Sequence, residues 1–247
     1  MAPSIRTPFP FPIRNAVLAS LPPADLARLR PMLRPVELAF DDALLTPGGI
    51  VEAVLFPESG VVSLLATLED GEQVGVELVG REGFVGHPLA VGDDRSLGEV
   101  RVQVEGTALR IDAAALREEL GASAALRGAL RRHVLVSHAE AVLTAACNAH
   151  HPINERLARW LLIAHDSAGT DEFAMAQDAM AVMLGVRRPG VSLAAGVMQK
   201  AGLIQYARGR MAVTDRPGLE DASCGCYRAA RRERARLLGP KPVHGAE

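Results

Sequence analysis

The chain contains few cysteines and no long hydrophobic run. Its 247 residues include only Cys147, Cys224 and Cys226, which do not form a disulfide framework. No apolar stretch approaches the length that a bilayer-spanning helix needs. The N-terminal sequence MAPSIRTPFPFPIR is interrupted by prolines and lacks the continuous apolar region of a secretory signal. We therefore expect a soluble cytoplasmic protein with reduced thiols and no membrane partner.

Common catalytic motifs are also missing. The sequence has no G-x-S-x-G, no H-E-x-x-H and no phosphate-binding loop with its lysine. The acidic pairs Asp41-Asp42 and Asp93-Asp94 stand in expected turns and need no catalytic role. We therefore predict that the protein is not an enzyme.

Charge is unevenly divided along the chain. The whole sequence has 27 basic and 29 acidic residues. Residues 1–151 contain 13 of the basic and 19 of the acidic residues, a balance of −6, and residues 152–247 contain the other 14 and 10, a balance of +4. A basic C-terminal part favours nucleic-acid binding in that part.

The segment Gln177–Lys200 has the pattern of two short helices around a glycine. Met180 and Leu184 fall on one apolar face of the first helix. Gly185 stands where a chain leaving a helix often needs a positive φ. Pro189 lacks a backbone N–H, which suits the first turn of a new helix. This spacing predicts a helix-turn-helix, and an ordinary corner between two helices is the alternative.

The second of these helices has two different faces. One is apolar, and the other is narrow and polar, formed by Arg188, Ser192, Gly196 and Gln199. A slim helix with donors near its N-terminus can enter a major groove and reach base edges and phosphates. This face therefore predicts a DNA-recognition helix.

A hairpin is expected directly after this helix. Residues 203–206 (LIQY) and 211–214 (MAVT) alternate as strands do, and Ala207–Arg210 form the turn between them. A helix-turn-helix followed by a small hairpin is a winged helix. Arg208 and Arg210 at the tip of the wing suit phosphate contacts, and a solvated turn is the alternative explanation of these arginines.

Residues 36–111 have the pattern of short strands separated by turns that contain glycine. The expected strands are Val36–Phe40, Ala53–Phe56, Val61–Leu65, Val74–Val79, Val100–Val104 and Ala108–Ile111. Such a series predicts an antiparallel barrel or jelly roll, whose interior side chains or one small ligand can fill.

A long helix is expected over residues 122–149. An approximate heptad runs along it through Leu126, Leu130, His133, Ser137, Glu140, Thr144 and Cys147. We favour a helix that packs against its twin in a homodimer, because a helix-turn-helix needs two half-sites. Burial of the helix on its own barrel is the alternative.

These patterns predict an α+β protein with an N-terminal antiparallel β-roll or jelly roll, a long dimerisation helix and a C-terminal winged helix-turn-helix. The expected divisions are a proline-rich tail at 1–13, an effector-type β-roll at 14–121, the dimerisation helix at 122–149, a hinge at 150–152, the winged helix at 153–237 and a tail at 238–247.

The order of these parts resembles the Crp/Fnr family of bacterial transcription regulators, over about residues 15–230. The most specific similarities are ERLARWLL (155–162), AVMLGVRRPGVSLAAGVMQKAGLI (181–204), the wing, and VELVGREGFVG (76–86). The resemblance implies a homodimer that binds a partly palindromic operator. An effector domain would bias the orientation of the DNA-binding domains, and RNA polymerase would be a further partner.

The resemblance also assigns residues. By position, Arg187, Arg188 and Ser192 would contact bases and phosphates. Pro189 replaces the glutamate that commonly follows the arginine in the family, so the operator should differ from that of the best-known members. Together with the polar face and the wing, the predicted DNA-binding residues are Arg187, Arg188, Ser192, Gln199, Arg208 and Arg210.

The effector site departs further from the family pattern. Nucleotide-binding members carry Gly-Glu and then an Arg-Ser or Arg-Thr pair that holds the cyclic phosphate, to which Glu82, Arg95 and Ser96 could correspond. Glu82 follows an arginine rather than a glycine, and the gap to Arg95 is long. Asp93 and Asp94 would oppose an anion. A cyclic nucleotide stays open as an effector, but these departures disfavour it.

Other cofactors are open or disfavoured for similar reasons. Members with an iron–sulfur cluster use clustered N-terminal cysteines, and this chain has none before Cys147, so we expect no such cluster. Haem-binding members use a histidine near the position of His87. Cys224 and Cys226 supply two thiolates where a structural zinc site needs four ligands, and His151 is far away along the chain. We therefore expect no metal site and reduced thiols, with a redox-sensing pair as the alternative.

Two functions fit the sequence. We favour a sequence-specific, dimeric transcription regulator whose β-roll senses a signal or acts without a ligand. A ligand-sensing module whose winged helix contacts protein instead of DNA is the alternative, and the basic C-terminal part argues against it.

Overall fold

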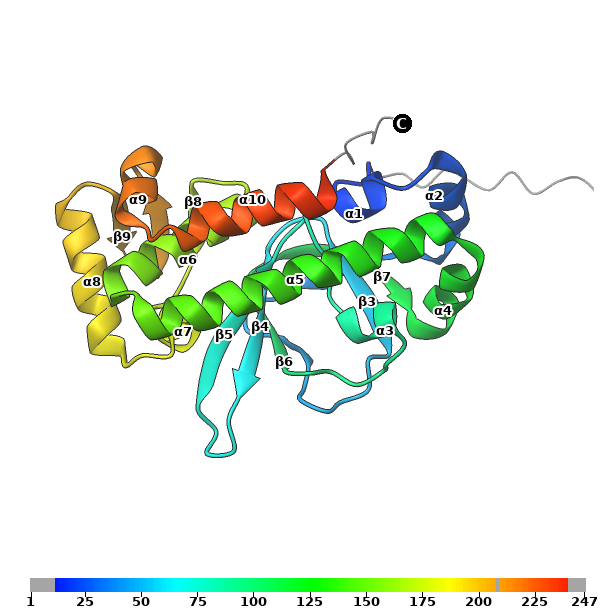
Figure 1. Cartoon of the computed structure of the whole chain (residues 1–247), viewed down its shortest axis with the longest axis horizontal. Helices are drawn as coiled ribbons and strands as arrows, with labels where there is room; N and C mark the ends of the chain where they lie inside the picture. The colour runs from blue at the N-terminus through cyan, green and yellow to red at the C-terminus, as the bar shows by residue number, and fades with distance from the viewer. Residues whose placement is uncertain (1–11, 208, 240–247) are drawn as a thin grey trace, which may run out of the picture.

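The computed structural model describes residues 12–207 and 209–239 (Figure 1). The expectations for Arg208, for most of the N-terminal tail (residues 1–11) and for most of the C-terminal tail (residues 240–247) lie outside these described residues. The described chain forms a β-rich N-terminal part, a long helix in front of it and a winged helix at one end (Figure 1).

Short helices precede the β-roll. They are α1 (Ala16–Ala19), α2 (Pro23–Leu29) and the 3-10 turn η1 (Arg30–Met32). The buried Asn15 side chain accepts hydrogen bonds from the Val17 and Leu18 amides, and its own amide group donates to the carbonyls of Pro57 and Gly83. Asn15 therefore caps α1 and ties it to the roll.

The roll consists of two antiparallel sheets, of order β1-β7-β3 and β2-β6-β4-β5. The strands are β1 (Arg34–Leu38), β2 (Ala43–Leu45), β3 (Ala53–Pro57), β4 (Val61–Thr67), β5 (Gln73–Val79), β6 (Glu99–Val104) and β7 (Gly106–Asp112). All six expected strands are present. The sequence analysis missed β2, because three residues are too few to show alternation.

Helices cover one side of the roll. They are α3 (His87–Val91), α4 (Ala113–Ala122) and the 27-residue α5 (Ala124–His150), whose first turn is capped by the Ser123 hydroxyl. Leu126 and Leu130 of α5 join Phe56, Phe84 and residues of α4 in one buried core. The N-terminal half of α5 is therefore part of the roll's own core.

The heptad expected at a dimer seam lies inside the chain instead. Every member of that series, from Leu126 to Cys147, is buried in the single chain. The roll covers one side of α5 and the C-terminal helix covers another, and these buried residues pack against both. The opposite face of α5 exposes different apolar side chains, including Leu135 (53% exposed) and Val142 (55% exposed).

The winged helix follows after Pro152. Its elements are α6 (Ile153–Ala168), β8 (Glu172–Ala174), α7 (Gln177–Leu184), α8 (Arg188–Lys200), β9 (Ile204–Ala207), β10 (Arg210–Val213), α9 (Arg216–Ala222) and α10 (Cys226–Leu238). The helix-turn-helix and the hairpin are confirmed. Residues 223–225 separate α9 from α10, and α10 then runs back along α5 (Figure 1).

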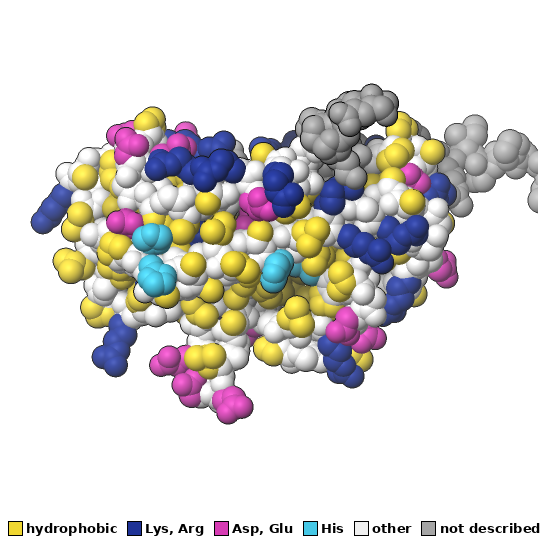
Figure 2. All heavy atoms as spheres, in the orientation of Figure 1, with side chains coloured by type: hydrophobic (Ala, Val, Ile, Leu, Met, Phe, Trp, Pro, Cys, Tyr) yellow, Lys and Arg dark blue, Asp and Glu magenta, His cyan; other side chains and the backbone are white. Residues whose placement is uncertain are grey.

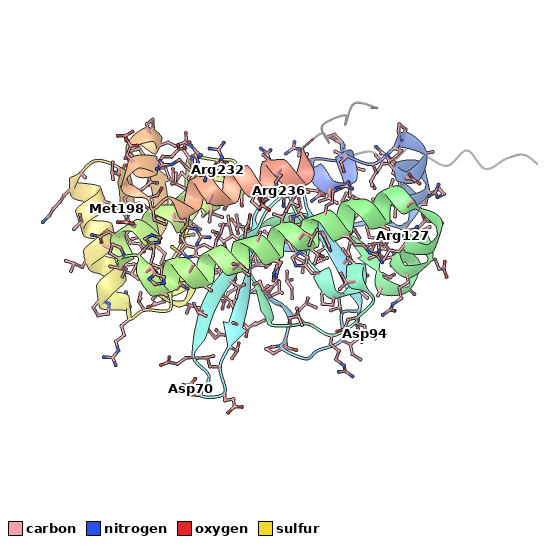
Figure 3. All side chains as sticks on the ribbon, in the orientation of Figure 1. Asp70, Asp94, Arg127, Met198, Arg232 and Arg236 are labelled. Atoms are coloured by element: carbon pink, nitrogen blue, oxygen red, sulfur yellow. The ribbon has the colours of Figure 1, made fainter. Side chains whose placement is uncertain are left out.

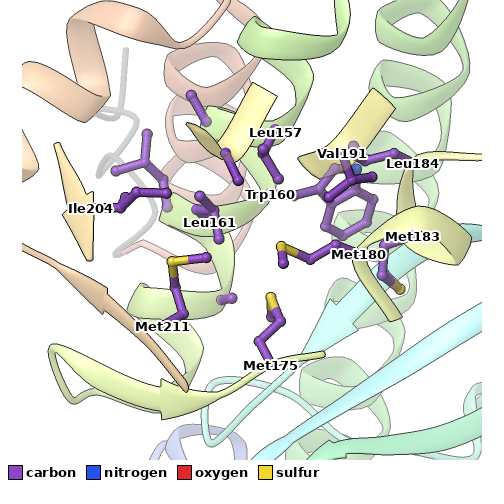
Figure 4. Close-up of a cluster of buried hydrophobic side chains, with 14 of the residues drawn as sticks. Leu157, Trp160, Leu161, Met175, Met180, Met183, Leu184, Val191, Ile204 and Met211 are labelled. Atoms are coloured by element: carbon purple, nitrogen blue, oxygen red, sulfur yellow. The ribbon is translucent and has the colours of Figure 1, made fainter. Parts of the chain in front are cut away.

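A separate apolar core holds the winged helix together. Leu157, Trp160 and Leu161 of α6 face Met180 and other residues of α7, α8 and the hairpin sheet β8-β10-β9 (Figure 4). Met175, Met180, Met183, Met198 and Met211 are buried in this core, where flexible methionine side chains can fill irregular gaps. This core fixes α8 to the outside of the domain.

The winged helix also rests on the roll. A Cβ atom at Gly75 of β5 would lie 2.9 Å from the Met183 Cα of α7, so only glycine permits this approach. The β4–β5 hairpin continues beyond this contact to an acidic tip near Asp70 (Figure 3). Within residues 12–207 and 209–239, no helix has the length and apolarity needed to cross a bilayer.

Candidate nucleic-acid interface and effector side

The turn between α7 and α8 has the expected geometry. Gly185 adopts φ 58° and ψ 43°, and its amide caps α7 by donating to the carbonyls of Ala181 and Val182. Pro189 lies in the first turn of α8. The left-handed conformation at Gly185 reverses the chain, so α8 leaves α7 toward solvent.

The two faces of α8 differ as the sequence predicts. Val191, Ala194, Ala195 and Met198 are buried on the domain core. The outward face is formed by Arg188, Ser192, Leu193, Gly196 and Val197. This face is exposed over its length, and its small residues keep the helix slim enough for a major groove.

Three predicted contact residues lie together at the N-terminal end of α8. Arg187 is its N-cap residue and is exposed. The Arg188 side chain is 62% exposed, with its Nε 3.5 Å from Asp178 Oδ1. The Ser192 hydroxyl donates to Gln177 Oε1 over 2.7 Å. An exposed ion pair of this kind is weak, so Arg188 can exchange Asp178 for another acceptor.

The other predicted contacts lie at the opposite end of α8. Gln199 Oε1 accepts a hydrogen bond of 2.9 Å from the Tyr206 amide and thereby joins α8 to the wing. Arg210 pairs with Glu172 of the neighbouring strand β8, and both side chains are more than half exposed. Gln199 therefore has a structural contact in addition to its exposed position.

Sequence reasoning missed two exposed apolar residues on α8. Leu193 is 73% exposed and Val197 is 49% exposed. Both are out of phase with the buried series of α8, and this phase difference is the signal that could have found them. Apolar side chains on such a face can contact thymine methyl groups.

Much of the basic charge of the C-terminal part lies on α10 instead of α8. Five arginines occur between Cys226 and Leu238, and Figure 2 shows basic side chains gathered over this helix. Arg232 and Arg236 are two of them (Figure 3). The charge asymmetry of the sequence therefore does not by itself locate the recognition surface.

A small cavity lies inside the β-roll beside α5. Its volume is about 40 Å³, and its lining is apolar except for a few side chains that include Glu77, His87 and Ser96. Cavities that take drug-sized ligands span roughly 300–1,000 Å³. In this conformation the interior of the roll has room for a few waters.

Buried ionisable side chains connect this cavity to α5. Glu77 Oε2 accepts a hydrogen bond from the Ser137 hydroxyl of α5 and lies 3.9 Å from His87 Nδ1. Burial, assisted by the charge of Glu140, raises the pKa of Glu77 to about 8. Burial lowers the pKa of His87 to about 4, and burial lowers the pKa of His133 well below its usual value. At neutral pH this cluster is therefore largely uncharged.

Two family models match separate parts of the chain. Residues 155–222 match a Crp-like helix-turn-helix domain, and residues 35–123 match a cyclic nucleotide-binding domain. The chain belongs to the Crp/Fnr family of transcription regulators. Its DNA-binding domain is the helix-turn-helix that carries α8.

Solved structures of Crp/Fnr regulators have the same fold. FixK2 from Bradyrhizobium japonicum is 14% identical with a TM-score of 0.65, over 78% of this chain and 98% of that chain. The c-di-GMP responsive regulator CLP from Xanthomonas campestris is 15% identical with a TM-score of 0.63, over 77% and 98%. A CRP-family regulator from Thermus thermophilus, TTHB099, is 19% identical with a TM-score of 0.62, over 76% and 96%. A comparison with curated proteins finds no match.

In this Crp/Fnr regulator, the three predicted effector residues have separate local partners. Glu82 Oε1 accepts from the Gly80 amide over 2.9 Å. Arg95 Nη1 donates to the Gly48 carbonyl over 3.0 Å, and the Ser96 hydroxyl donates to the Gly98 carbonyl over 2.7 Å.

These residues also face different spaces. Ser96 borders the small interior cavity, whereas Glu82 borders a separate cavity of about 570 Å³ beside α10. Arg95 lines neither of these cavities. The structure therefore does not bring the three residues together around one anion.

Proposed function

We propose that this chain acts as a homodimer that binds a partly palindromic DNA operator in the cytoplasm and regulates transcription there, with RNA polymerase as a further partner. The observation that carries this proposal is the outward face of α8, which is slim, open to solvent and begins with two exposed arginines. Arg187 and Arg188 border a cavity of about 740 Å³ that Glu72, Gln73 and Val74 of the β4–β5 hairpin also line. Both arginines are nevertheless exposed, so they are accessible to a duplex.

The roles on α8 follow from position. Arg188 reaches guanine in the major groove, because a guanidinium matches the two acceptors on that base edge. Arg187 and Ser192 contact phosphates or neighbouring base edges. Leu193 packs on a thymine methyl group, and Gly196 lets the helix backbone approach the groove closely.

The exposed face of α5 supports the homodimer. Leu135, Val142 and Ala149 recur every seven residues, with His138 and Ala145 between them, and all five are exposed. Figure 2 shows hydrophobic side chains gathered along this helix. Pairing this stripe with its copy around a two-fold axis would bury the apolar side chains and present two α8 helices to successive half-sites.

The β-roll would bias this arrangement through α5. Glu77 and His87 border the interior cavity, and Ser137 and His133 of α5 adjoin them. The small cavity and its carboxyl group support a signal other than a cyclic nucleotide, or action without a ligand. Any change in the cavity would act directly on the helix that joins the two chains.

Binding-site selection from random DNA tests the proposal. We expect wild-type protein to enrich a partly palindromic sequence. On that sequence, Arg188→Ala should lose about 1–3 kcal/mol of binding free energy, because it removes a bidentate base contact. Arg117→Ala on α4 is the matched control, since Arg117 is an exposed arginine of the β-roll part, and it should bind like wild type. No enriched sequence, or equal binding by Arg188→Ala, would reject the assignment of α8.

The exposed Leu193 and Val197 favour one alternative, in which α8 contacts a protein. The salt dependence of binding separates the two functions. DNA binding loses affinity steeply as salt rises because counterions are released from the phosphates, whereas an apolar protein contact does not. Leu193→Ala should alter sequence preference in the first case and protein capture in the second.

A further inference from the structure

The three cysteines of the chain meet one histidine at the hinge between α5 and α6. Cys147 lies in the last turn of α5, and His151 is the residue that caps this helix, one turn further on. Cys224 lies in the break between α9 and α10, and Cys226, on the other side of Gly225, is the first residue of α10. In Figure 1, the C-terminal end of α5 and the start of α10 lie at the same end of the molecule. His151 and the C-x-C pair are far apart in the sequence, so their spacing could not show that they form a close cluster.

The distances in this cluster match those around one tetrahedral metal ion. Cys147 Sγ lies 3.5 Å from Cys224 Sγ, and Cys226 Sγ lies 3.6 Å from His151 Nδ1. All four ligand atoms lie within 4.8 Å of one another. A zinc ion with Zn–S of about 2.3 Å and Zn–N of about 2.0–2.1 Å holds two sulfurs about 3.8 Å apart, and a sulfur and a nitrogen about 3.6 Å apart.

A buried arginine beside the cluster gives an independent indication of negative charge there. Arg159 of α6 is 1% exposed. Its Nη2 donates to Thr144 Oγ1 over 3.0 Å and its guanidinium lies 5.5 Å from the Trp160 ring, but its Nε and Nη1 have no hydrogen-bond partner among the described residues. The Cys224 thiol and burial raise the pKa of the Cys147 thiol, and burial and the Cys224 thiol raise the pKa of the Cys226 thiol. The positive charge of Arg159 opposes both rises.

A zinc ion with three thiolates and a neutral histidine carries a net charge of −1. This charge would balance Arg159, which forms no ion pair with a carboxylate among residues 12–207 and 209–239. Burying an unpaired guanidinium is strongly unfavourable. A disulfide between Cys147 and Cys224 would use two of the four ligand atoms and leave Arg159 without a counter-charge.

We propose that Cys147, His151, Cys224 and Cys226 bind one structural zinc ion. Zinc favours this ligand set, because three cysteines and one histidine complete its tetrahedron and leave no open position. The ion joins the two sides of the hinge, since two ligands belong to the end of α5 and two to the segment after the wing. It thereby holds the winged helix in one orientation on the dimerisation helix.

Metal analysis of the full chain tests the site directly. Protein purified under reducing conditions without chelator should contain one zinc per chain by plasma mass spectrometry. Cobalt in its place should give the intense visible absorption of a tetrahedral thiolate site. A chain that contains no zinc and takes up neither metal, or one with an iron–sulfur spectrum or a Cys147–Cys224 disulfide by mass spectrometry, would overturn the proposal.

Histidine variants provide the matched control. His151→Ala should lose more than the ~10–100-fold in zinc affinity that removal of an outer-shell partner costs. His150→Ala changes the preceding, exposed histidine and should keep wild-type zinc content. His151→Cys restores a fourth ligand and should bind zinc again, which separates lost coordination from misfolding. Equal zinc affinity in His151→Ala and wild type would contradict the proposal.

The consequence for the hinge has its own measurement. Removing zinc from the wild-type chain should increase hydrogen exchange in α10 and at the end of α5 while leaving the β-roll unchanged. These results do not depend on DNA binding. Failure of the zinc site and failure of the regulator function can therefore be distinguished.

Discussion

The winged helix presents its candidate functional side chains to solvent, whereas the β-roll keeps several of its polar side chains inside. The Arg188 side chain is 62% exposed, and Glu77 is 1% exposed. An exposed arginine keeps its charge and can meet an external partner. A buried carboxyl group gives up its charge and responds to changes in its own surroundings. The comparison shows one part whose charged side chains are open to an external partner and another whose ionisable side chains are shielded from water.

The largest expected effect concerns α5, which connects the two parts. The double variant Leu135→Glu/Val142→Glu places four carboxylates at the proposed seam of a dimer, so like charges should separate the chains. We expect monomers by sedimentation and at least about a 100-fold loss of operator affinity, because each half-site alone binds weakly.

Leu97→Glu is the control for this variant. Leu97 is an exposed leucine of the β-roll (84% exposed) that lies outside α5, so its replacement should leave the dimer intact. A dimeric double variant would show that α5 does not form the seam. In that case α5 would not be the element that links the β-roll and the winged helix to the second chain.

The next effect concerns the buried carboxyl group of the β-roll. The pKa of Glu77 is raised from 4.5 to about 8 in the folded chain, so the folded state binds a proton that the unfolded state releases between these values. The free energy of unfolding of the wild type should therefore fall as pH rises from about 5 to 8. Glu77→Gln mimics the protonated form and should be more stable than wild type above pH 8, on the order of 2 kcal/mol.

Urea unfolding at a series of pH values measures this difference. Both proteins keep His87 and His133, so the difference between their curves isolates the Glu77 carboxyl group. The two stabilities should converge near pH 5. Parallel curves from pH 5 to 9 would show that Glu77 ionises in the folded roll as it does in water.

The smallest expected effect lies at the wing. Arg210→Ala should weaken binding to all DNA sequences alike, because a phosphate contact carries no sequence information. Losing one contact reduces the salt slope by about 0.9, so the fall in affinity between 50 and 200 mM salt should be about three- to fourfold smaller.

Glu172→Gln provides the opposite change at the same place. It removes the partner of Arg210 in the free protein and should leave DNA binding equal or tighter. A change in sequence preference by Arg210→Ala would mean that the wing reads bases, which would bring its role closer to that of α8.

Much of the fold could be predicted because the local periodicity of apolar residues specifies helices and strands. The helix-turn-helix, the wing and six strands of the roll follow from the 3.6- and 2-residue patterns and from glycines such as Gly185, whose positive φ the structure confirms. The strands β2 and β8 were missed, since three residues show no period.

The candidate sites were predictable only where one element carries them. Arg187, Arg188 and Ser192 share the exposed face of α8, so helical spacing alone placed them together. Glu82 comes from one loop and the adjacent Arg95 and Ser96 from another, and no local pattern could show that these residues face different spaces. The exposed Leu193 was within reach of the sequence, because its phase on α8 differs from that of the buried residues.

The sequence by itself determined the helices, most strands and which face of α8 is exposed, because these depend on residues a few positions apart. The tertiary structure decided which face of α5 is buried, how far Glu77 is removed from water, and that His151 meets Cys226 across 75 positions. Such meetings depend on how whole elements pack, and the spacing of residues within one element contains no information about them.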